Sequence, residues 1–224
     1  MPNYKYKRVT LFAGHYGSGK TNIAVNFALK MANDGYKVKI ADLDIVNPYF
    51  RTKDSADRLN EAGIELISPN FANTNVDLPA LPQEAYKLVQ QKDFNAVLDI
   101  GGDDRGAYAL GRYAPYILEE NDYEMIFVAN FYRPLTTTPE EALEVMREIE
   151  EACKMKFTAI INNSNLGPLT TAQDVTVTQS KANKLSNLSG LPVIFTTVAS
   201  GVEGVEGDDL FTLKLQEKYF DIKE

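Results

Sequence analysis

The sequence of 224 residues contains one cysteine, Cys153, and one histidine, His15. One thiol cannot close an internal disulfide, and a metal site made of Cys and His side chains needs roughly three or four such ligands. An iron–sulfur cluster shared between two copies of the chain would also lack thiolates. The composition therefore excludes disulfide-stapled folds and Cys/His metal sites within one chain, and it disfavours an Fe–S cluster.

Long apolar runs and long basic runs are missing as well. No stretch approaches the roughly 20 apolar residues that a helix needs to cross a bilayer, and residues 1–10 lack the apolar segment of a secretory signal. The formal net charge is −8, so a polyanion is repelled on average. We therefore expect a cytoplasmic protein that binds neither a membrane nor a nucleic acid.

The rest of the composition is that of an ordinary globular protein, with 44% hydrophobic and 24% charged residues. Hydrophobic cores usually divide only in chains longer than about 250 residues. We therefore expect a single nucleotide-binding domain that spans residues 1–224.

Short apolar runs alternate with stretches of helical periodicity, which is the pattern of βα units and a parallel sheet. The apolar runs predict strands at 9–13, 37–43, 64–67, 96–100, 125–129, 157–161 and 192–196. The periodic stretches predict helices at 20–33, 83–91, 107–118, 172–188 and 208–220, and one that begins with a capping box between Thr138 and Glu141. The expected fold class is α/β, a three-layer, doubly wound, mostly parallel sheet with helices on both faces.

The segment between the first strand and the first helix satisfies G-x-x-x-x-G-K-[ST]. Glycines in this pattern let backbone N–H groups curl around an anion, and the helix that follows adds its positive end. Lys20 can reach the β- and γ-phosphates of a nucleotide, and the Thr21 hydroxyl can bind Mg²⁺. The expected nucleotide contacts here are Gly14, His15, Tyr16, Gly17, Ser18, Gly19, Lys20, Thr21 and Asn22.

Carboxylates stand at the ends of two later strands, where ligands of open parallel sheets bind. Asp99 begins a D-x-x-G pattern, so its carboxylate can hold Mg²⁺ while the Gly102 N–H meets the γ-phosphate. Asp44 can orient the attacking water or touch Mg²⁺, and Asp42, inside the strand, is the weaker candidate. The alternative is that these carboxylates cap turns. The catalytic candidates are therefore Lys20, Asp44 and Asp99, and the metal candidates are Thr21, Asp44 and Asp99.

Two further groups of polar residues follow strand ends. Arg51, Arg105 and Arg133 could stabilise transition-state charge, although each is also explained as a surface or ion-pair arginine. Asn162 and Asn163 follow another strand without the aspartate that commonly reads guanine, and an amide can both donate to and accept from adenine. This favours ATP over GTP, with an ordinary asparagine turn as the alternative.

Together these segments resemble the P-loop ATPases of the MinD/ParA and cobyrinate-synthase-type (CobQ/CobB-like) superfamily. The similar segments are residues 14–21, 41–47, 97–102 and 160–163. The resemblance implies that Lys20 and Thr21 bind phosphate and Mg²⁺, and that Asp44 is the switch-one aspartate and Asp99 the Walker B aspartate. It also implies that Asn162 or Asn163 touches the base and that Pro192 lies near the wall of the base pocket.

The chain departs from this family at His15. Many MinD- and ParA-like members carry a signature lysine there, which reaches the partner's phosphates in an ATP-bridged dimer. A homodimer is possible here without that lysine. The acidic surroundings of Leu210 and Phe220 also differ from the basic amphipathic helix of membrane-cycling members.

The leading hypothesis is a Mg²⁺-dependent ATPase that binds ATP and ADP and acts as a nucleotide-state switch for a partner protein. An alternative is an ATP-using small-molecule kinase or synthetase similar to the dethiobiotin and cobyrinate enzymes, with residues 70–82 shaping a substrate pocket. A third reading is a nucleotide-binding module that does not hydrolyse ATP. The partner, the substrate and the oligomeric state are not encoded in any motif of the sequence.

Overall fold

The computed structural model describes residues 4–43, 55–67, 83–102, 104–207 and 209–215. Its eight strands form one sheet in the order β3-β2-β4-β1-β5-β6-β7-β8, and every neighbouring pair is parallel. The strands are β1 (Val9–Ala13), β2 (Val38–Leu43), β3 (Glu65–Ile67), β4 (Asn95–Ile100), β5 (Tyr123–Ala129), β6 (Ala159–Asn162), β7 (Val193–Ala199) and β8 (Leu210–Leu213).

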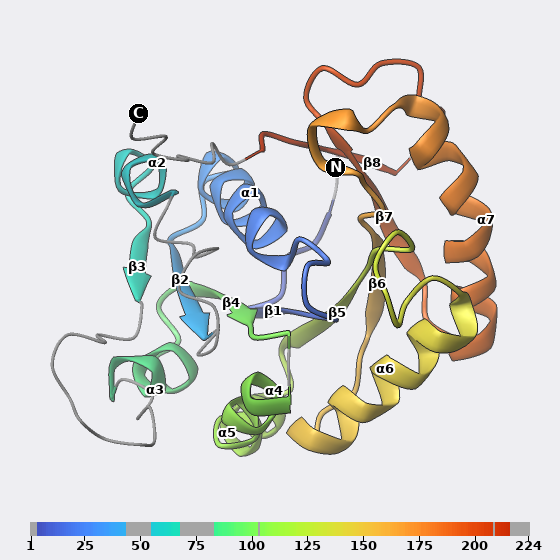
Figure 1. Cartoon of the computed structure of the whole chain (residues 1–224). Helices are drawn as coiled ribbons and strands as arrows, with labels where there is room; N and C mark the ends of the chain where they lie inside the picture. Colours follow the sequence, from blue (N-terminus) through green and yellow to red (C-terminus); the bar gives the residue numbers. More distant parts are fainter. Residues whose placement is uncertain (1–3, 44–54, 68–82, 103, 208, 216–224) are drawn as a thin grey trace, which may run out of the picture.

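Helices cover both faces of this sheet (Figure 1). The helices are α1 (Lys20–Asn33), α2 (Ala56–Glu61), α3 (Gln83–Gln90), α4 (Asp104–Gly111), α5 (Ala114–Glu120), α6 (Pro139–Cys153) and α7 (Ala172–Ser189). Buried side chains of α1 and α2 share one core with the sheet, and those of α3 to α7 share the other. The predicted three-layer α/β fold is confirmed.

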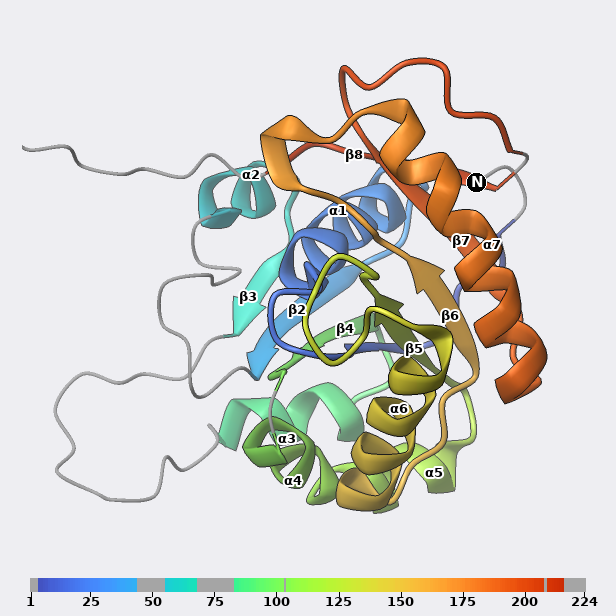
Figure 2. The ribbon, with the colours of Figure 1, turned by 45° about the vertical axis from the view of Figure 1, so that its right-hand side comes forward.

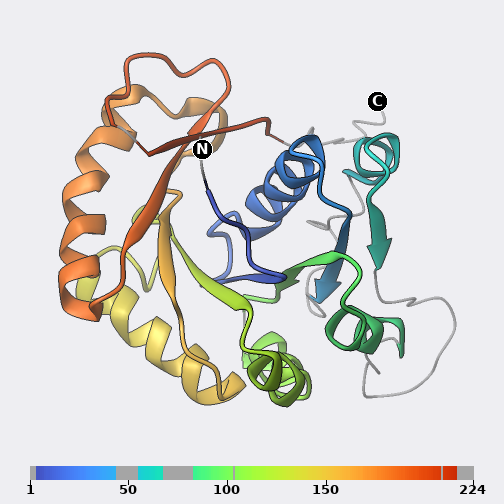
Figure 3. The same ribbon diagram turned by 180° about the vertical axis from the view of Figure 1, so that it is seen from behind.

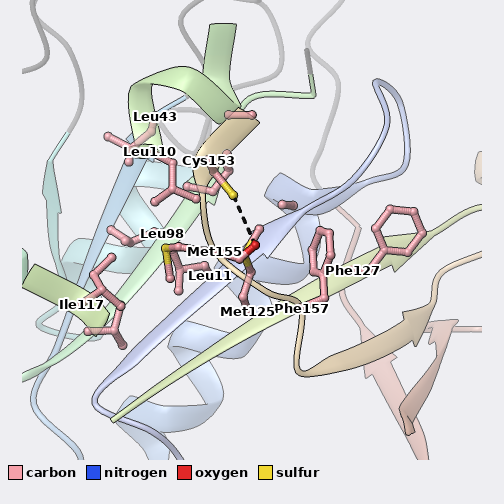
Figure 4. Close-up of a cluster of buried hydrophobic side chains, with 14 of the residues drawn as sticks. Leu11, Leu43, Leu98, Leu110, Ile117, Met125, Phe127, Cys153, Met155 and Phe157 are labelled. Atoms are coloured by element: carbon pink, nitrogen blue, oxygen red, sulfur yellow. Dashed lines mark hydrogen bonds between the residues drawn. The ribbon is translucent and has the colours of Figure 1, made fainter. Parts of the chain in front are cut away.

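The larger core lies between the sheet and helices α3 to α7. Figure 4 shows Leu11, Leu98 and Phe127 of three neighbouring strands packed against Ile117 of α5 and Cys153 of α6. The Cys153 thiol is buried, which raises its pKa above the usual range, and it donates to the Met155 carbonyl at 3.8 Å. The only cysteine of the sequence is therefore a packing residue in the described structure.

The second core holds α1 against the sheet. Ile23, Phe27 and Met31 of α1 are fully buried, and Phe27 packs edge-on against Phe12 of β1 with ring centroids 5.2 Å apart. In the view from behind (Figure 3), the N-terminal segment runs beside β7, where the Tyr4 ring lies 5.1 Å from that of Phe195. Since α1 is buried along its length, its first turn is held rigidly at the end of β1.

The prediction of a helix at 208–220 is wrong for its described part, because Leu210–Leu213 is the edge strand β8. Phe211 and Leu213 are buried while Thr212 is exposed, which is the two-residue period of a strand. Asn26 of α1 holds the chain directly after β8, because its side-chain amide donates to the Lys214 carbonyl at 3.0 Å and accepts from the Lys214 N–H at 2.9 Å.

The predicted single helix at 107–118 is also corrected, since α4 ends at Gly111 and α5 begins at Ala114. Pro115 explains the break, because proline fits the first turn of a helix and disrupts its interior. The capping box of α6 is confirmed, with Thr138 and Glu141 hydrogen-bonded to each other's backbone N–H groups.

Candidate functional site

The loops after β1, β4, β5, β6 and β7 all leave the sheet at its carboxyl edge, because the strands are parallel. Figure 2 allows the loops after β1 and β5 to be followed at the start of α1. Most residues of the expected site lie at this edge: 14–22, Asp99, Gly102, Asn162 and Asn163. Asp44, Arg51 and the predicted loop at 70–82 lie outside the described residues.

Pro192 does not lie at this edge. It precedes β7, and its carbonyl accepts from the Ile160 N–H near the start of β6, at 2.8 Å. The expectation that Pro192 lies near the base pocket is therefore corrected. Residues 197–199 of β7 are the ones that reach the carboxyl edge of the sheet, because the strand extends three residues beyond its predicted end.

The loop between β1 and α1 needs glycine for steric reasons at two positions. Gly14 packs so closely on β5 that a Cβ would lie 2.6 Å from the Val128 carbonyl oxygen. Gly19 has φ +90°, and a Cβ there would lie 2.3 Å from the Asn163 amide nitrogen. The Val128 oxygen is a backbone atom and cannot give way, and at Gly19 a side chain would require both a left-handed φ and displacement of the Asn163 amide. The two glycines therefore allow the loop to curl directly above the sheet.

Side chains from three elements hold carbonyl groups of this loop. Lys20 Nζ donates to the His15 carbonyl at 3.1 Å. Arg133 Nε donates to the Gly17 carbonyl at 3.0 Å, and Asn163 Nδ2 donates to the Ser18 carbonyl at 2.6 Å. In a trans peptide the C=O and the next N–H point in opposite directions. The Ser18 N–H, opposite the Gly17 carbonyl, donates to the His15 carbonyl at 3.1 Å and closes the loop, while the Gly19 N–H is directed away from Asn163, which holds the Ser18 carbonyl.

His15 stands where many MinD- and ParA-like proteins carry a signature lysine, but its ring is engaged locally. Its Nδ1 lies 3.0 Å from the Tyr16 carbonyl oxygen, and the side chain is half-buried. The neighbouring Tyr16 is exposed. The described structure thus places His15 within the loop itself, where it shapes the turn.

Two carboxylates lie side by side in the sheet next to this loop. Asp99 of β4 and Asp42 of β2 are register partners, and both are 1% exposed. Residues in register on parallel strands point to the same face. Their neighbours Ile40 and Val97 belong to the α1 core, so both carboxylates face the side of the sheet on which Lys20 lies. Sequence reasoning ranked Asp42 second, although the Asp-Leu-Asp alternation already put Asp42 and Asp44 on one face.

The loop after β4 packs directly on the loop between β1 and α1 (residues 14–19), which we call the phosphate loop after its sequence motif. A Cβ on Gly102 would lie 2.8 Å from Lys20 Nζ and 2.8 Å from the Tyr16 backbone nitrogen. A Cβ on Gly106 would lie 2.6 Å from the Gly101 Cα, so the start of α4 packs on the same loop. The D-x-x-G segment is thereby in contact with both the backbone and the lysine of the cradle.

The two asparagines after β6 are buried and bonded to protein groups. Asn162 donates to the Thr178 hydroxyl at 3.0 Å and accepts from the Ser164 hydroxyl at 2.7 Å. The Asn163 amide oxygen accepts from Thr197, while its nitrogen holds the Ser18 carbonyl. These amides support the phosphate loop and the strand ends, so the argument for adenine from their hydrogen-bonding capacity loses its basis.

A small cavity lies beside Asn163 at the carboxyl edge. It is lined by residues of the β6 loop, the end of β7 and the end of β8, namely Asn163, Asn165, Gly167, Thr170, Val175, Thr197, Ala199, Leu213 and Leu215. The cavity therefore lies at the edge of the sheet where ligands of open α/β sheets bind.

The residues around the loop also fit a magnesium ion. Among the described residues, no group of three or more His, Cys, Asp and Glu side chains could hold a metal by itself. Mg²⁺ does not need one, because it is usually bound through one or two carboxylates together with waters and substrate phosphates. Thr21 at the start of α1 and the buried Asp99 supply that kind of partial ligand set.

In the part of the chain that the structure describes, no helix is both long and apolar enough to cross a bilayer. No model of a known protein family matches the chain, and no curated protein matches it by sequence.

Solved structures do resemble the chain. The cell division protein FtsY of Thermotoga maritima matches with a TM-score of 0.62 and 18% identity, over 88% of this chain and 63% of that one. The chloroplast FtsY of Physcomitrella patens gives 0.56 and 20%, over 91% and 61%. The signal recognition particle 54 kDa protein of Aeropyrum pernix K1, in complex with GDP, gives 0.52 and 14%, over 88% and 42%.

These similarities establish the fold: the chain has the same three-layer α/β architecture as the FtsY and signal recognition particle structures. It spans about three fifths of the length of the two FtsY structures. The more specific MinD/ParA and CobQ/CobB-like assignment stays a resemblance in the motifs of residues 14–21, 41–47, 97–102 and 160–163.

Proposed function

We propose that this chain binds a nucleoside triphosphate with Mg²⁺ and hydrolyses it, and that the nucleotide state controls the loop after β4. The observation that carries the proposal is the phosphate loop. Its carbonyls are held by Lys20, Arg133 and Asn163, and it lies directly before the buried helix α1. Converging N–H groups, a helix N-terminus and a lysine together form a polyphosphate site.

The proposed roles follow from these positions. Loop N–H groups and Lys20 bind the phosphates, and Thr21 and Asp99 hold Mg²⁺, with the buried Asp42 as a further carboxylate beside Asp99. When bound, Mg²⁺ would neutralise charge on the phosphate oxygens. The role of Asp44 as the residue that positions water rests on the resemblance alone.

The proposed switch rests on Gly102. This residue packs against Tyr16 and Lys20, and Lys20 is the residue proposed to reach the β- and γ-phosphates. A γ-phosphate bound there would contact Gly102, and it would therefore displace Gly102 from its present contact with the loop. Binding and hydrolysis would therefore move residues 101–106, and a partner protein that contacts this segment would sense the change.

The identity of the nucleotide base is proposed from the resemblance and from similar structures. ATP follows from the resemblance to the MinD/ParA group. GTP is the alternative, because similar structures include GDP complexes such as that of FtsY from Elizabethkingia anophelis, with 16% identity and a TM-score of 0.55. Both nucleotides therefore belong in the first experiment.

Titration of the protein with fluorescent mant-ATP and mant-GTP in the presence of Mg²⁺ tests the proposal, and phosphate release tests hydrolysis. The chain contains no tryptophan, so its own fluorescence interferes little. Lys20→Ala should weaken binding by about 100-fold or more, since it removes charge-assisted hydrogen bonds. Lys30→Ala, on the same helix but paired with Asp34, is the matched control.

Equal binding by the wild-type protein and Lys20→Ala, or no binding to either nucleotide, would refute the phosphate-site assignment. Nucleotide consumption that begins only when a metabolite is added would instead favour the kinase or synthetase alternative.

A further inference from the structure

Arg133 lies in the loop between β5 and α6 and reaches across to the phosphate loop. Its Nε donates to the Gly17 carbonyl at 3.0 Å. The side chain also packs on the Gly17 Cα, because a Cβ built there would lie 3.5 Å from Nε and 3.6 Å from Cδ. The Arg133 side chain therefore lies in van der Waals contact with Gly17, on the exposed outer side of the loop.

This contact orients one particular peptide group. The Gly17 carbonyl belongs to the peptide that also carries the Ser18 N–H, and the two groups point in opposite directions. With the carbonyl held by Arg133, the Ser18 N–H points to the opposite side, where it donates a hydrogen bond to the His15 carbonyl at 3.1 Å and closes the turn of the loop. Lys20 Nζ is bonded to that same oxygen. Arg133 thus fixes, from outside, the curl that brings these groups together.

The loop that carries Arg133 is itself tightly built. The buried Asn130 accepts from the Arg133 N–H at 3.1 Å and from the Thr136 hydroxyl at 2.8 Å through its backbone carbonyl. The Phe131 N–H donates to the Ser164 hydroxyl at 3.0 Å, which ties the loop to β6. Leu135 completes the turn with φ +64°, a left-handed conformation that a leucine adopts only at an energetic cost.

The charge of Arg133 is not balanced by a carboxylate in the part of the chain that the structure describes. The ion pairs found there are Lys7–Asp122, Arg8–Glu120, Lys30–Asp34, Lys37–Asp93, Lys39–Glu65, Lys156–Glu150 and Lys184–Glu140. The chain has 31 acidic and 23 basic residues, so carboxylates outnumber cations. A half-buried arginine that meets a backbone carbonyl in such a chain leaves a fixed positive charge beside the phosphate loop.

We propose that Arg133 is a positioning residue for the nucleotide phosphates. It holds the peptide between Gly17 and Ser18 in the orientation that the cradle requires, and it adds a positive charge that the same chain supplies. This inference rests on the proposed function. It also gives the chain a second cation at the loop, where His15 stands in place of the family's signature lysine and is engaged with Tyr16.

The test compares Arg133→Gln, Arg133→Lys and Arg147→Gln. Arg147 is an exposed arginine of α6, so its variant makes the same change of charge away from the loop. We expect Arg133→Gln to weaken mant-nucleotide binding by about tenfold or more, because a hydrogen bond from a charged donor is lost. KM should rise by a similar factor while kcat changes by less than about threefold, since the loop holds substrate and transition state alike.

Arg133→Lys should recover part of the affinity, because an ammonium can still donate one hydrogen bond and carry the charge. The affinity of Arg133→Gln should also depend less steeply on salt than that of the wild-type protein. All three variants should unfold at temperatures within a few degrees of the wild type, which shows that the loss is not one of folding.

The proposal is overturned if Arg133→Gln binds nucleotide as tightly as Arg147→Gln, or if Arg133→Lys recovers nothing and the salt dependence is unchanged. In either case the proposed function survives as long as Lys20→Ala still abolishes binding. If the wild-type protein binds neither nucleotide, the proposed function fails and the role of Arg133 fails with it.

Discussion

Two loops at the carboxyl edge of the sheet, 14–19 after β1 and 163–171 after β6, are built in opposite ways. The β6 loop has many internal hydrogen bonds: Asn165 donates to the Asn163 carbonyl and accepts from the Gly167 N–H, and Thr170 bonds to both Leu166 and Gly167. Ser164 and Asn165 add bonds to the loop after β5. The phosphate loop instead takes its support from Arg133, in the loop after β5, and from Asn163.

The difference separates a scaffold from a binding loop. Polar side chains that bond to their own loop fix its shape but leave few groups for a ligand. A glycine-rich loop has no side chains for this purpose, so its shape must come from neighbours, and its N–H groups can then serve an anion. Asn163 joins the two loops, because it belongs to one and holds Ser18 of the other.

The largest effect is expected at the point where the loops touch. Gly19→Ala places a Cβ 2.3 Å from the Asn163 amide at φ +90°, so either the phosphate loop or Asn163 must move. We expect a loss of about 3 kcal/mol in unfolding free energy and at least about a 100-fold loss in nucleotide affinity. Urea unfolding and mant-nucleotide titration measure the two quantities. Wild-type affinity in this variant would show that the close contact has no role.

Asn163→Ala should have the next largest effect. It removes the Asn163 donor to the Ser18 carbonyl and one of the two acceptors of the Thr197 hydroxyl, which keeps the Asn162 carbonyl at 3.4 Å. We expect about 2 kcal/mol lower stability and roughly tenfold weaker nucleotide binding. Asn183→Ala, at an exposed position of α7, is the control. Lower stability with unchanged affinity would mean that the phosphate loop keeps its shape without this bond.

Asn162→Ala tests the comparison from the other side, because it removes hydrogen bonds of the scaffold alone. It removes the hydrogen bonds to Thr178 and Ser164 but none to the phosphate loop. We expect about 1–2 kcal/mol lower stability and less than a twofold change in nucleotide affinity. A tenfold loss of affinity would contradict the division between the two loops and would restore a role for Asn162 at the base.

The smallest effect is expected at the end of the β6 loop, where Asp174 caps α7. Hydrogen bonds from the Thr171 hydroxyl and N–H lower the pKa of Asp174. A lowered pKa stabilises the folded state above the pKa of the unfolded chain, and this contribution is lost as the pH falls through the folded value. Asp174→Ala should therefore lower Tm slightly at pH 7, and the difference should shrink as the pH falls below about 4 towards the lowered pKa of Asp174. A difference that is equally large at pH 3 would point to lost packing instead.

The sequence was sufficient to predict the layers and the phosphate loop, because both depend on local patterns. The strand, glycine and lysine spacing at 9–21 predicts a β1–loop–α1 unit, and the structure contains one. The C-terminal strand was missed because the alternation of Phe211 and Leu213 covers only four residues and lies among acidic residues that also suit a helix surface.

The support of the site could not be predicted in the same way. The bond between Arg133 and Gly17 joins residues 116 positions apart, and that between Asn163 and Ser18 joins residues 145 apart. Their partners are backbone carbonyls, which leave no residue-type signal in the sequence. Pro192 was misplaced for a different reason: its assignment came from the resemblance, although the predicted parallel strand 192–196 already put Pro192 at the start of that strand.

The contact of Gly102 with Tyr16 and Lys20 has a consequence for the rate of nucleotide binding rather than for the affinity. If a triphosphate enters as proposed, residue 102 must withdraw before the last phosphate settles. Stopped-flow traces would then approach a plateau at high nucleotide concentration, set by the opening of the loop after β4. A diphosphate would not extend as far as Gly102, so its association rate would not reach such a plateau.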